Sequence, residues 1–317
     1  MDLWSVVFTQ EFIIEFLRAT VRMATPILIA CLGQIFTQRS GILNLGVEGI
    51  MMMGALASFV GALLINDFAG LLFAVLVGGT LGLFISVMMV NFSLPQHVVG
   101  IGFWMFGVNM ASFLARIIWG FKPPTAITGL PITPIPILDK IPIIGEALFS
   151  HDIFLYFTFF VLVPLCWLVI HRTRWGLVIT ATGENPKAAD TMGVNVYRVR
   201  SLCIILGGIM ASLGGAYLTL AYVKMFSDGM TAGRGWIAIA LTFFSQWDPA
   251  KALIGALLFG ASYSFYFRAQ TLAIPIPYRF LLMVPYVMTI VAMVIIYTRK
   301  RVVAPAALAT PYRRGST

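Results

Sequence analysis

Six residues that could bind a polar solute interrupt long apolar stretches of the sequence. They are Asn44, Glu48, Asn91, Asn109, Arg234 and Trp236. Polar groups are costly inside lipid, so they usually face a cavity, a solute path or a neighbouring helix. We predict a translocation path or gate that uses Asn44, Glu48, Asn109, Arg234 and Trp236. Helix capping or bonding between helices stays open as a simpler role for each.

Motifs of catalysis and nucleotide binding are absent from the sequence. No Gly-Lys pair occurs, so there is no GxxxxGK[ST] loop to bind phosphate, and GxSxG is missing as well. His97, His151 and His171 are far apart and lack the spacing of metal ligands. We therefore predict no catalytic residue, no metal and no cofactor in this chain.

The composition identifies an integral membrane protein. Hydrophobic residues make up 60% of the 317 residues, charged residues only 10%, and the mean hydropathy is +0.94. A helix needs about 20 apolar residues to cross roughly 30 Å of hydrocarbon. We predict an all-α protein with about nine spans (8–10), placed at 19–36, 45–65, 68–90, 98–118, 152–171, 201–222, 236–247, 251–268 and 281–298.

The span at 236–247 is too short to cross a membrane unaided. Its twelve residues reach about 18 Å. Two interpretations stay open. The segment is either a half-helix that lines a path or the end of a longer helix that begins near Gly229.

Basic residues indicate which segments face the cytoplasm. The net charge of +9 would suggest nucleic acid in a soluble domain, but here it bears on orientation, and we predict no nucleic-acid partner. The residues 172–200 and the tail 299–317 are rich in Lys and Arg and fall on one side, so we predict that both are cytoplasmic. Residues 1–18 alternate apolar and acidic positions and are predicted to form an interfacial segment outside, before a transmembrane domain over 19–298.

The predicted external loop at 119–151 contains six prolines. They exclude a regular helix and favour extended or turn backbone. The loop is either a stiff connector or a docking surface for a partner that delivers substrate.

A short capped helix is predicted inside the cytoplasmic loop. Asn185 can cap it, Pro186 suits its first position and Gly193 suits a left-handed stop. Ala188 and Ala189 give it a face for close packing. Two turns of helix are marginal alone, so the segment is either a compact turn or a peg for a soluble partner.

Four motifs resemble the permease subunits of bacterial ABC importers. They are "QRSGILNLGVEGIMMMGA", "GENPKAADTMGVNVYRVR", "GMTAGRGWIAIALTFFSQWDP" and the late "VPY" at 284–286. The resemblance runs in order from about residue 20 to residue 297. It is to the sugar and branched-chain amino acid permease superfamily, most closely to nucleoside or "simple sugar" permeases.

The resemblance implies a fold, a location and partners. The fold is that of the type II ABC importer transmembrane domain, in a multi-pass protein of the bacterial cytoplasmic (inner) membrane. The partners are ABC ATPase subunits that hold ATP and Mg, a second permease subunit, an external substrate-binding (lipo)protein and membrane lipid. The residues implied to couple this chain to the ATPase are Glu184, Asn185, Pro186, Lys187, Ala188, Ala189, Asp190 and Gly193.

The expected function is import of a small polar solute by alternating access, with nucleosides ahead of simple sugars. An ion-coupled secondary transporter is the alternative from another class, but it predicts several charged residues at mid-membrane. Glu48 is the one acid well inside a predicted span. A membrane-embedded enzyme lacks its catalytic residues.

The stretch from Arg39 to Glu48 is interpreted as a cytoplasmic turn and the start of the next helix. Asn44 is expected to cap that helix, and Glu48 to favour its N-terminus, paired with Arg39. Glu48 would then lie about 6 Å into the helix, short of the membrane midplane. We predict that it gates or positions a helix rather than binding cargo.

Overall fold

The structure is a computed structural model that describes residues 10–120, 126–136, 139, 144–271 and 304–314, with five single positions between 283 and 294. Seven helices within these residues are long and apolar enough to cross a membrane. Three of them end or continue in π-helical turns. In chain order the spans are α2 (Gln10–Arg39), α3 (Val47–Leu64), α4 with η1 (Asp67–Ser86, Val87–Asn91), α5 (Gln96–Trp119), α7 with η3 and α8 (Ile153–Tyr156, Phe157–Leu162, Val163–Arg172), α11 with η4 (Val196–Tyr217, Leu218–Tyr222) and α13 (Pro249–Thr271).

The remaining elements are short. They are β1 (Ile132–Pro134), α6 (Ile144–Leu148), β2 (Ser150–Asp152), α9 (Arg174–Glu184), α10 (Pro186–Thr191) and α12 (Arg234–Phe244). The two three-residue strands are a small addition to the predicted all-α fold. The seven long helices match the predicted spans outside 236–247 and 281–298, and 281–298 lies largely outside the described residues.

The first span is longer than predicted. Its helix, α2, begins at Gln10 and runs unbroken to Arg39, so residues 10–18 are the first turns of that helix rather than a separate element. Residues 1–9 of the predicted interfacial segment lie outside the described residues.

The predicted short span at 236–247 forms a short helix, α12, and is not the end of a longer helix that begins near Gly229. Residues 229–233 form turns, and Gly233, with φ of 81°, stands immediately before α12. The eleven residues of α12 reach about 16 Å, roughly half of the hydrocarbon core. The helix alone is therefore too short to cross the membrane.

Small residues bring α11 close to its neighbours, because Gly207, Ala211 and Gly215 recur at every fourth position along it. A Cβ on Gly33 of α2 would lie 2.8 Å from the Cβ of Met210, and one on Gly78 of α4 would lie 2.6 Å from the carbonyl oxygen of Gly208. The Ser212 hydroxyl donates to the Ala74 carbonyl at 2.6 Å. Close backbone approach of this kind holds helices together where no hydrophobic force acts between them.

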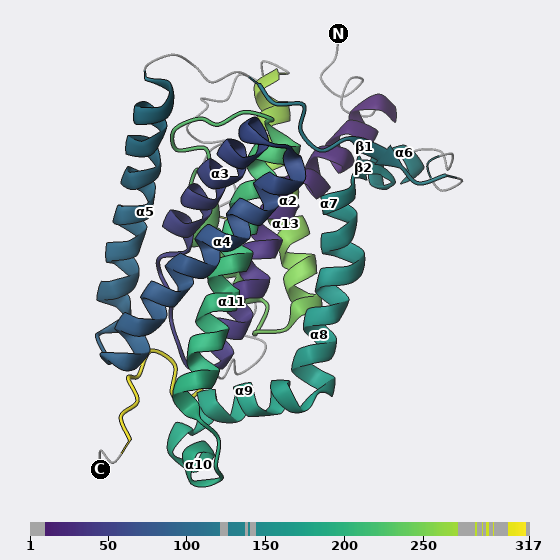
Figure 1. Ribbon diagram of the computed structural model, residues 1–317. Coiled ribbons are helices and arrows are strands. Elements are labelled where there is room, and N and C mark those ends of the chain that lie inside the picture. The colour runs from purple at the N-terminus through teal and green to yellow at the C-terminus, as the bar shows by residue number, and fades with distance from the viewer. Residues whose placement is uncertain are drawn as a thin grey trace.

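The two ends of the bundle carry different structures (Figure 1). At one end α9 lies across the helix ends, α10 projects beyond them and residues 304–314 run alongside; β1, β2 and α6 lie at the other end, beside the start of α2. The two segments predicted to be cytoplasmic, 172–200 and the described part of the tail, thus lie at the same end of the bundle, opposite the Pro-rich segment.

The Pro-rich segment is held against the bundle where it is described. Its strands pair antiparallel, with Ile132 opposite Asp152, and the Leu130 amide donates to the Leu220 carbonyl at 2.8 Å. Arg18 of α2 reaches Glu146 of α6 at 3.0 Å. Extended backbone was predicted here, and α6 forms only after the last proline of the loop.

Candidate functional site

The projecting helix α10 is built by its own sequence. The Asn185 side chain accepts from the Ala188 amide at 3.0 Å, and Pro186 is the first helical residue. Gly193 has φ of 85°, in the left-handed region that ends helices. The predicted caps are confirmed, and they leave about two turns of helix.

One face of α10 is buried and the other is open. Ala189 is 5% exposed and packs with Val196 and Tyr312, whereas Ala188 and Lys187 are exposed. Met192, just beyond the helix, is 83% exposed. The predicted packing face therefore contains Ala189 but not Ala188. We call α10 and its open side, which presents Ala188 and Lys187, the knob.

The C-terminal strap, residues 304–314, holds the knob and was not predicted. Its Tyr312 ring lies 5.7 Å from the Tyr197 ring, and its Arg314 pairs with Asp190 at 3.0 Å. The Ala306 amide donates to Glu184 at 3.3 Å. Arg200, 2% exposed, donates to the Thr310 carbonyl of the strap and to the Ser40 carbonyl. These contacts fix the base of α10.

Behind α10, helix α9 meets the end of α2 backbone to backbone. A Cβ on Gly183 would lie 2.9 Å from the Arg39 carbonyl carbon, and the Ala307 amide of the strap donates to the Gly183 carbonyl at 2.9 Å. Arg39 donates from Nε to the Trp247 carbonyl at 3.0 Å, and the Trp247 indole donates to Gln38 at 2.9 Å. The end of α12 is thus tied to the base of the knob.

The other end of α12 is held by Glu48. Its Oε1 accepts from the Gly233 amide at 2.7 Å and its Oε2 accepts from the Gly235 amide at 2.6 Å. The carboxylate, 5% exposed, therefore neutralises the free amides and the positive end of the α12 dipole. Glu48 does not pair with Arg39, because Arg39 lies at the far end of α12.

Glu48 lies deeper in the bundle than expected. Residues 40–46 contain no helix beyond the turn at 40 and 41, and α3 begins only at Val47. The neighbouring Gly49 packs on Phe103 and Gly107 of α5, seven to eleven residues beyond the start of that helix at Gln96. That corresponds to about 10–16 Å along α5 from this end of the bundle.

Arg234 and Trp236 lie in the first turn of α12, on either side of the Gly235 amide that donates to Glu48. Arg234, 6% exposed, donates to the carbonyls of Met230 and Thr231. Its guanidinium lies 5.4 Å from the centre of the Tyr263 ring. Trp236 meets Trp104 of α5 edge to face at 5.3 Å, and both rings are half-buried.

Asn44 differs from its predicted role as a helix cap, and Asn91 and Asn109 lie apart from Glu48. Asn44 does not cap α3, because its Oδ1 accepts from the Gly46 amide at 2.9 Å and Gly46 is the N-cap. Asn91 closes the π-helical turn η1 and is exposed. Asn109 is exposed on α5, where its Nδ2 donates to the Met105 carbonyl at 2.7 Å. Neither Asn91 nor Asn109 contacts Glu48 in any described bond.

Comparison with known proteins decides the class. The family of the branched-chain amino acid transport system permease component matches residues 16–294. The chain belongs to this permease family. It is 33% identical to the guanosine ABC transporter permease protein NupQ of Bacillus subtilis over 308 residues, covering 94% of this chain and 96% of the relative.

Two further relatives span most of the permease. The nucleoside ABC transporter permease protein NupC of Lactococcus lactis is 33% identical over 279 residues, 85% of this chain and 88% of the relative. The putative glucose ABC transporter permease protein TsgC13 of Haloferax volcanii is 38% identical over 269 residues, covering 83% of this chain and 80% of the relative. The permease is therefore a multi-pass transport subunit of the inner membrane that works with ATPase and binding-protein partners.

The permease shows no cluster of three or more His, Cys, Asp or Glu side chains that could hold a metal among the described residues. Trp104 and the strap are the parts of the site that the sequence interpretation missed. An uncharged run at 304–311 inside a basic tail is the signal that could have indicated docking of the strap. For Trp104 the sequence offers no signal, because aromatic residues also serve helix packing.

Proposed function

We propose that this permease forms half of a nucleoside import pore and is driven by a separate ATPase subunit through α10. The observation that carries the proposal is the knob itself. A capped two-turn helix projects beyond the bundle with its Ala188 side open, while strap and α11 contacts hold its base. A helix too short to be stable alone is held there in the position of a docking peg.

The proposed fold is that of a type II importer with nine spans. The half-helix α12 and residues 223–233 before it together make the seventh crossing, from the Lys224 carbonyl at the Pro-rich end to Trp247 beside Arg39, and residues 281–298 supply the ninth. The α10 end faces the cytoplasm in this arrangement, supported by the Lys and Arg of 172–200 and of the tail. Residues 126–152 then face outward, where a binding protein delivers substrate.

The contacts of α12 suggest how ATP hydrolysis on the partner reaches the middle of the membrane. A push on α10 acts on α9, and Gly183 abuts Arg39 without room for a side chain. Arg39 and Gln38 both bond to Trp247, just beyond α12. Because α12 is about 16 Å of rigid helix, its movement would displace the end that Glu48 holds.

At that end, Glu48, Arg234, Trp236 and Trp104 form the proposed gate. The positive end of α12 is already balanced by the Glu48 carboxylate, so the site has no strong preference for a charged solute. Half-helices with buried termini line the substrate path in other transporters. The half-exposed face of Trp104 and Trp236 is completed by a second permease subunit in this account, and ATP and Mg bind to the ATPase.

A nucleoside is the proposed cargo. It is neutral, and its base can stack on an indole ring. The chain-length likeness to a guanosine permease supports this choice. A simple sugar is the second candidate, because the relative with 38% identity is described as a putative glucose permease.

Uptake by cells tests the cargo. Deleting the gene for this chain from its host should abolish uptake of labelled guanosine from dilute medium and leave glucose uptake intact. Restoring the chain should restore guanosine uptake. Loss of glucose uptake with guanosine uptake unchanged would instead support the sugar permease.

A further inference from the structure

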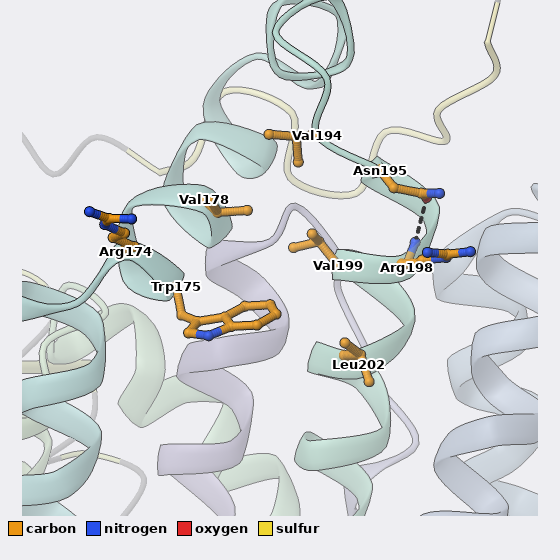
Figure 2. A pocket seen from close by; sticks show the side chains of 8 residues that line it. All are labelled: Arg174, Trp175, Val178, Val194, Asn195, Arg198, Val199 and Leu202. Carbon is orange, nitrogen blue, oxygen red and sulfur yellow. Dashed lines mark hydrogen bonds between the residues drawn. The ribbon is translucent and has the colours of Figure 1, made fainter.

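An apolar groove opens between α9 and α11 (Figure 2). Trp175 and Val178 line it from α9, and Val199 and Leu202 line it from α11. The indole of Trp175 reaches from α9 toward Leu202. The cavity has a volume of about 360 Å³, and its lining is almost wholly apolar.

The groove continues toward the middle of the bundle. A second cavity of about 180 Å³ shares Trp175, Val199 and Leu202 and extends to Leu206, with Phe36 of α2 among its lining residues. From Arg198 to Leu206 the path along α11 is about 12 Å, close to the depth of one leaflet's hydrocarbon at about 15 Å. The groove thus has the length and polarity to hold one acyl chain.

Positive charge marks the end of the groove nearest α10. Arg174 and Arg198 lie on opposite rims, and their side chains point outward to opposite sides. Both are exposed, and neither guanidinium makes a hydrogen bond or ion pair among the described residues. No acidic residue lines either cavity. A neutral or positively charged partner would leave these cations unbalanced.

We propose that the groove binds an anionic phospholipid of the cytoplasmic leaflet, with an acyl chain along Trp175 and Leu206 and the headgroup at the end of the groove that Arg174 and Arg198 flank. Basic pockets between transmembrane helices on this side suit anionic headgroups, and an interfacial tryptophan suits the boundary between chain and headgroup. The leaflet rests on the proposed orientation. Binding itself depends neither on cargo nor on the ATPase. A lipid bound here would brace α9, which leads directly into α10.

Quenching of tryptophan fluorescence by brominated lipid tests the site. The full chain is placed in phosphatidylcholine vesicles with increasing phosphatidylglycerol brominated on its acyl chains. The signal of Trp175 is the difference between the chain and Trp175→Phe, which keeps a ring in place. We expect brominated phosphatidylglycerol to quench this signal at lower mole fraction than brominated phosphatidylcholine does.

Charge-removal variants then separate a site from general attraction. Arg174→Gln and Arg198→Gln should each lower the preference for phosphatidylglycerol by about fivefold, the effect of about one surface charge. Arg172→Gln is the matched control, because Arg172 lies against the Trp167 ring and does not line the groove. It should leave the preference unchanged.

Three results would overturn the proposal. Equal quenching by the two brominated lipids would remove the charge preference, and an equal loss in Arg172→Gln would make it nonspecific. Absence of quenching by either lipid would mean that another protein surface, such as a second copy, covers the groove. None of these results depends on transport or ATPase activity, so they leave the proposed function to its own test.

Discussion

Replacing Glu48 by Gln tests whether this carboxylate positions α12. The substitution keeps the size of the side chain but puts an NH₂ group where one backbone amide now donates. One hydrogen bond to a charged group is lost, about 1.5–3 kcal/mol, together with about 0.3–1 kcal/mol of helix-terminus electrostatics. The expected loss is therefore about 2–4 kcal/mol in the energy that holds the α12 end in place.

If that energy separates the working arrangement of α12 from a displaced one, transport should fall by at least about 30-fold, because 1.4 kcal/mol corresponds to tenfold. The assay is uptake into proteoliposomes that contain this chain, its ATPase, its sister permease and the loaded binding protein. Thr80→Ala is the control, since Thr80 is exposed on α4 and bonds only to its own helix. Cargo preference should stay the same. Near-normal transport with a changed preference would refute the positioning role and make Glu48 a cargo contact.

Three other predictions concern the knob and the external segment. Tyr312→Ala should weaken the docking of the strap by about 2–4 kcal/mol, because apolar burial and one aromatic pair are lost, and proteolysis after residue 304 should become faster. Pro311→Ala, at an exposed position, should leave the rate of proteolysis unchanged. Gly183→Ala should cost about 1–3 kcal/mol by overpacking on the Arg39 backbone and lower binding-protein-stimulated ATPase activity, whereas Ala181→Ser on the exposed side of α9 should not; equal activity in both would contradict the tight junction. Burial lowers the pKa of His151 below its usual 6.5, so the unfolded segment takes up a proton first and the stability of the folded segment falls as pH drops through about 6.5. Proteolysis of residues 126–152 should therefore be faster at pH 5 than at pH 7. A His151→Gln variant that keeps the same pH dependence would contradict this.

Local chemistry explains what could be predicted from the sequence. The bounds of α10 depend on Asn185, Pro186 and Gly193, each of which acts within four residues. The shortness of α12 could be predicted because its apolar run at 236–247 has only twelve residues before Asp248 and Pro249. The close packing of α11 follows from spacing, because small residues every fourth position leave room for a neighbouring backbone on one face.

Contacts between distant segments explain what could not be predicted. Asn44 was a reasonable cap, but the Leu43 amide donates to Gln96 of α5 at 2.7 Å, 53 residues away, and holds this stretch extended so that the helix starts later. Glu48 was expected near the surface because the helix was expected to begin at Asn44. Its partner, the α12 terminus, is 185 residues away, and nothing in either segment alone indicates that they meet.

The central claim is that α10 docks on the ATPase subunit. Ala188→Glu tests it most directly, because Ala188 is exposed and is the third helical residue, where an acidic side chain favours the helix terminus rather than breaking it. Ala250→Glu is the matched control, exposed in the first turn of α13. Copurification of the ATPase with the purified chain should fall at least tenfold in Ala188→Glu and stay normal in Ala250→Glu. Full copurification with Ala188→Glu would contradict the account.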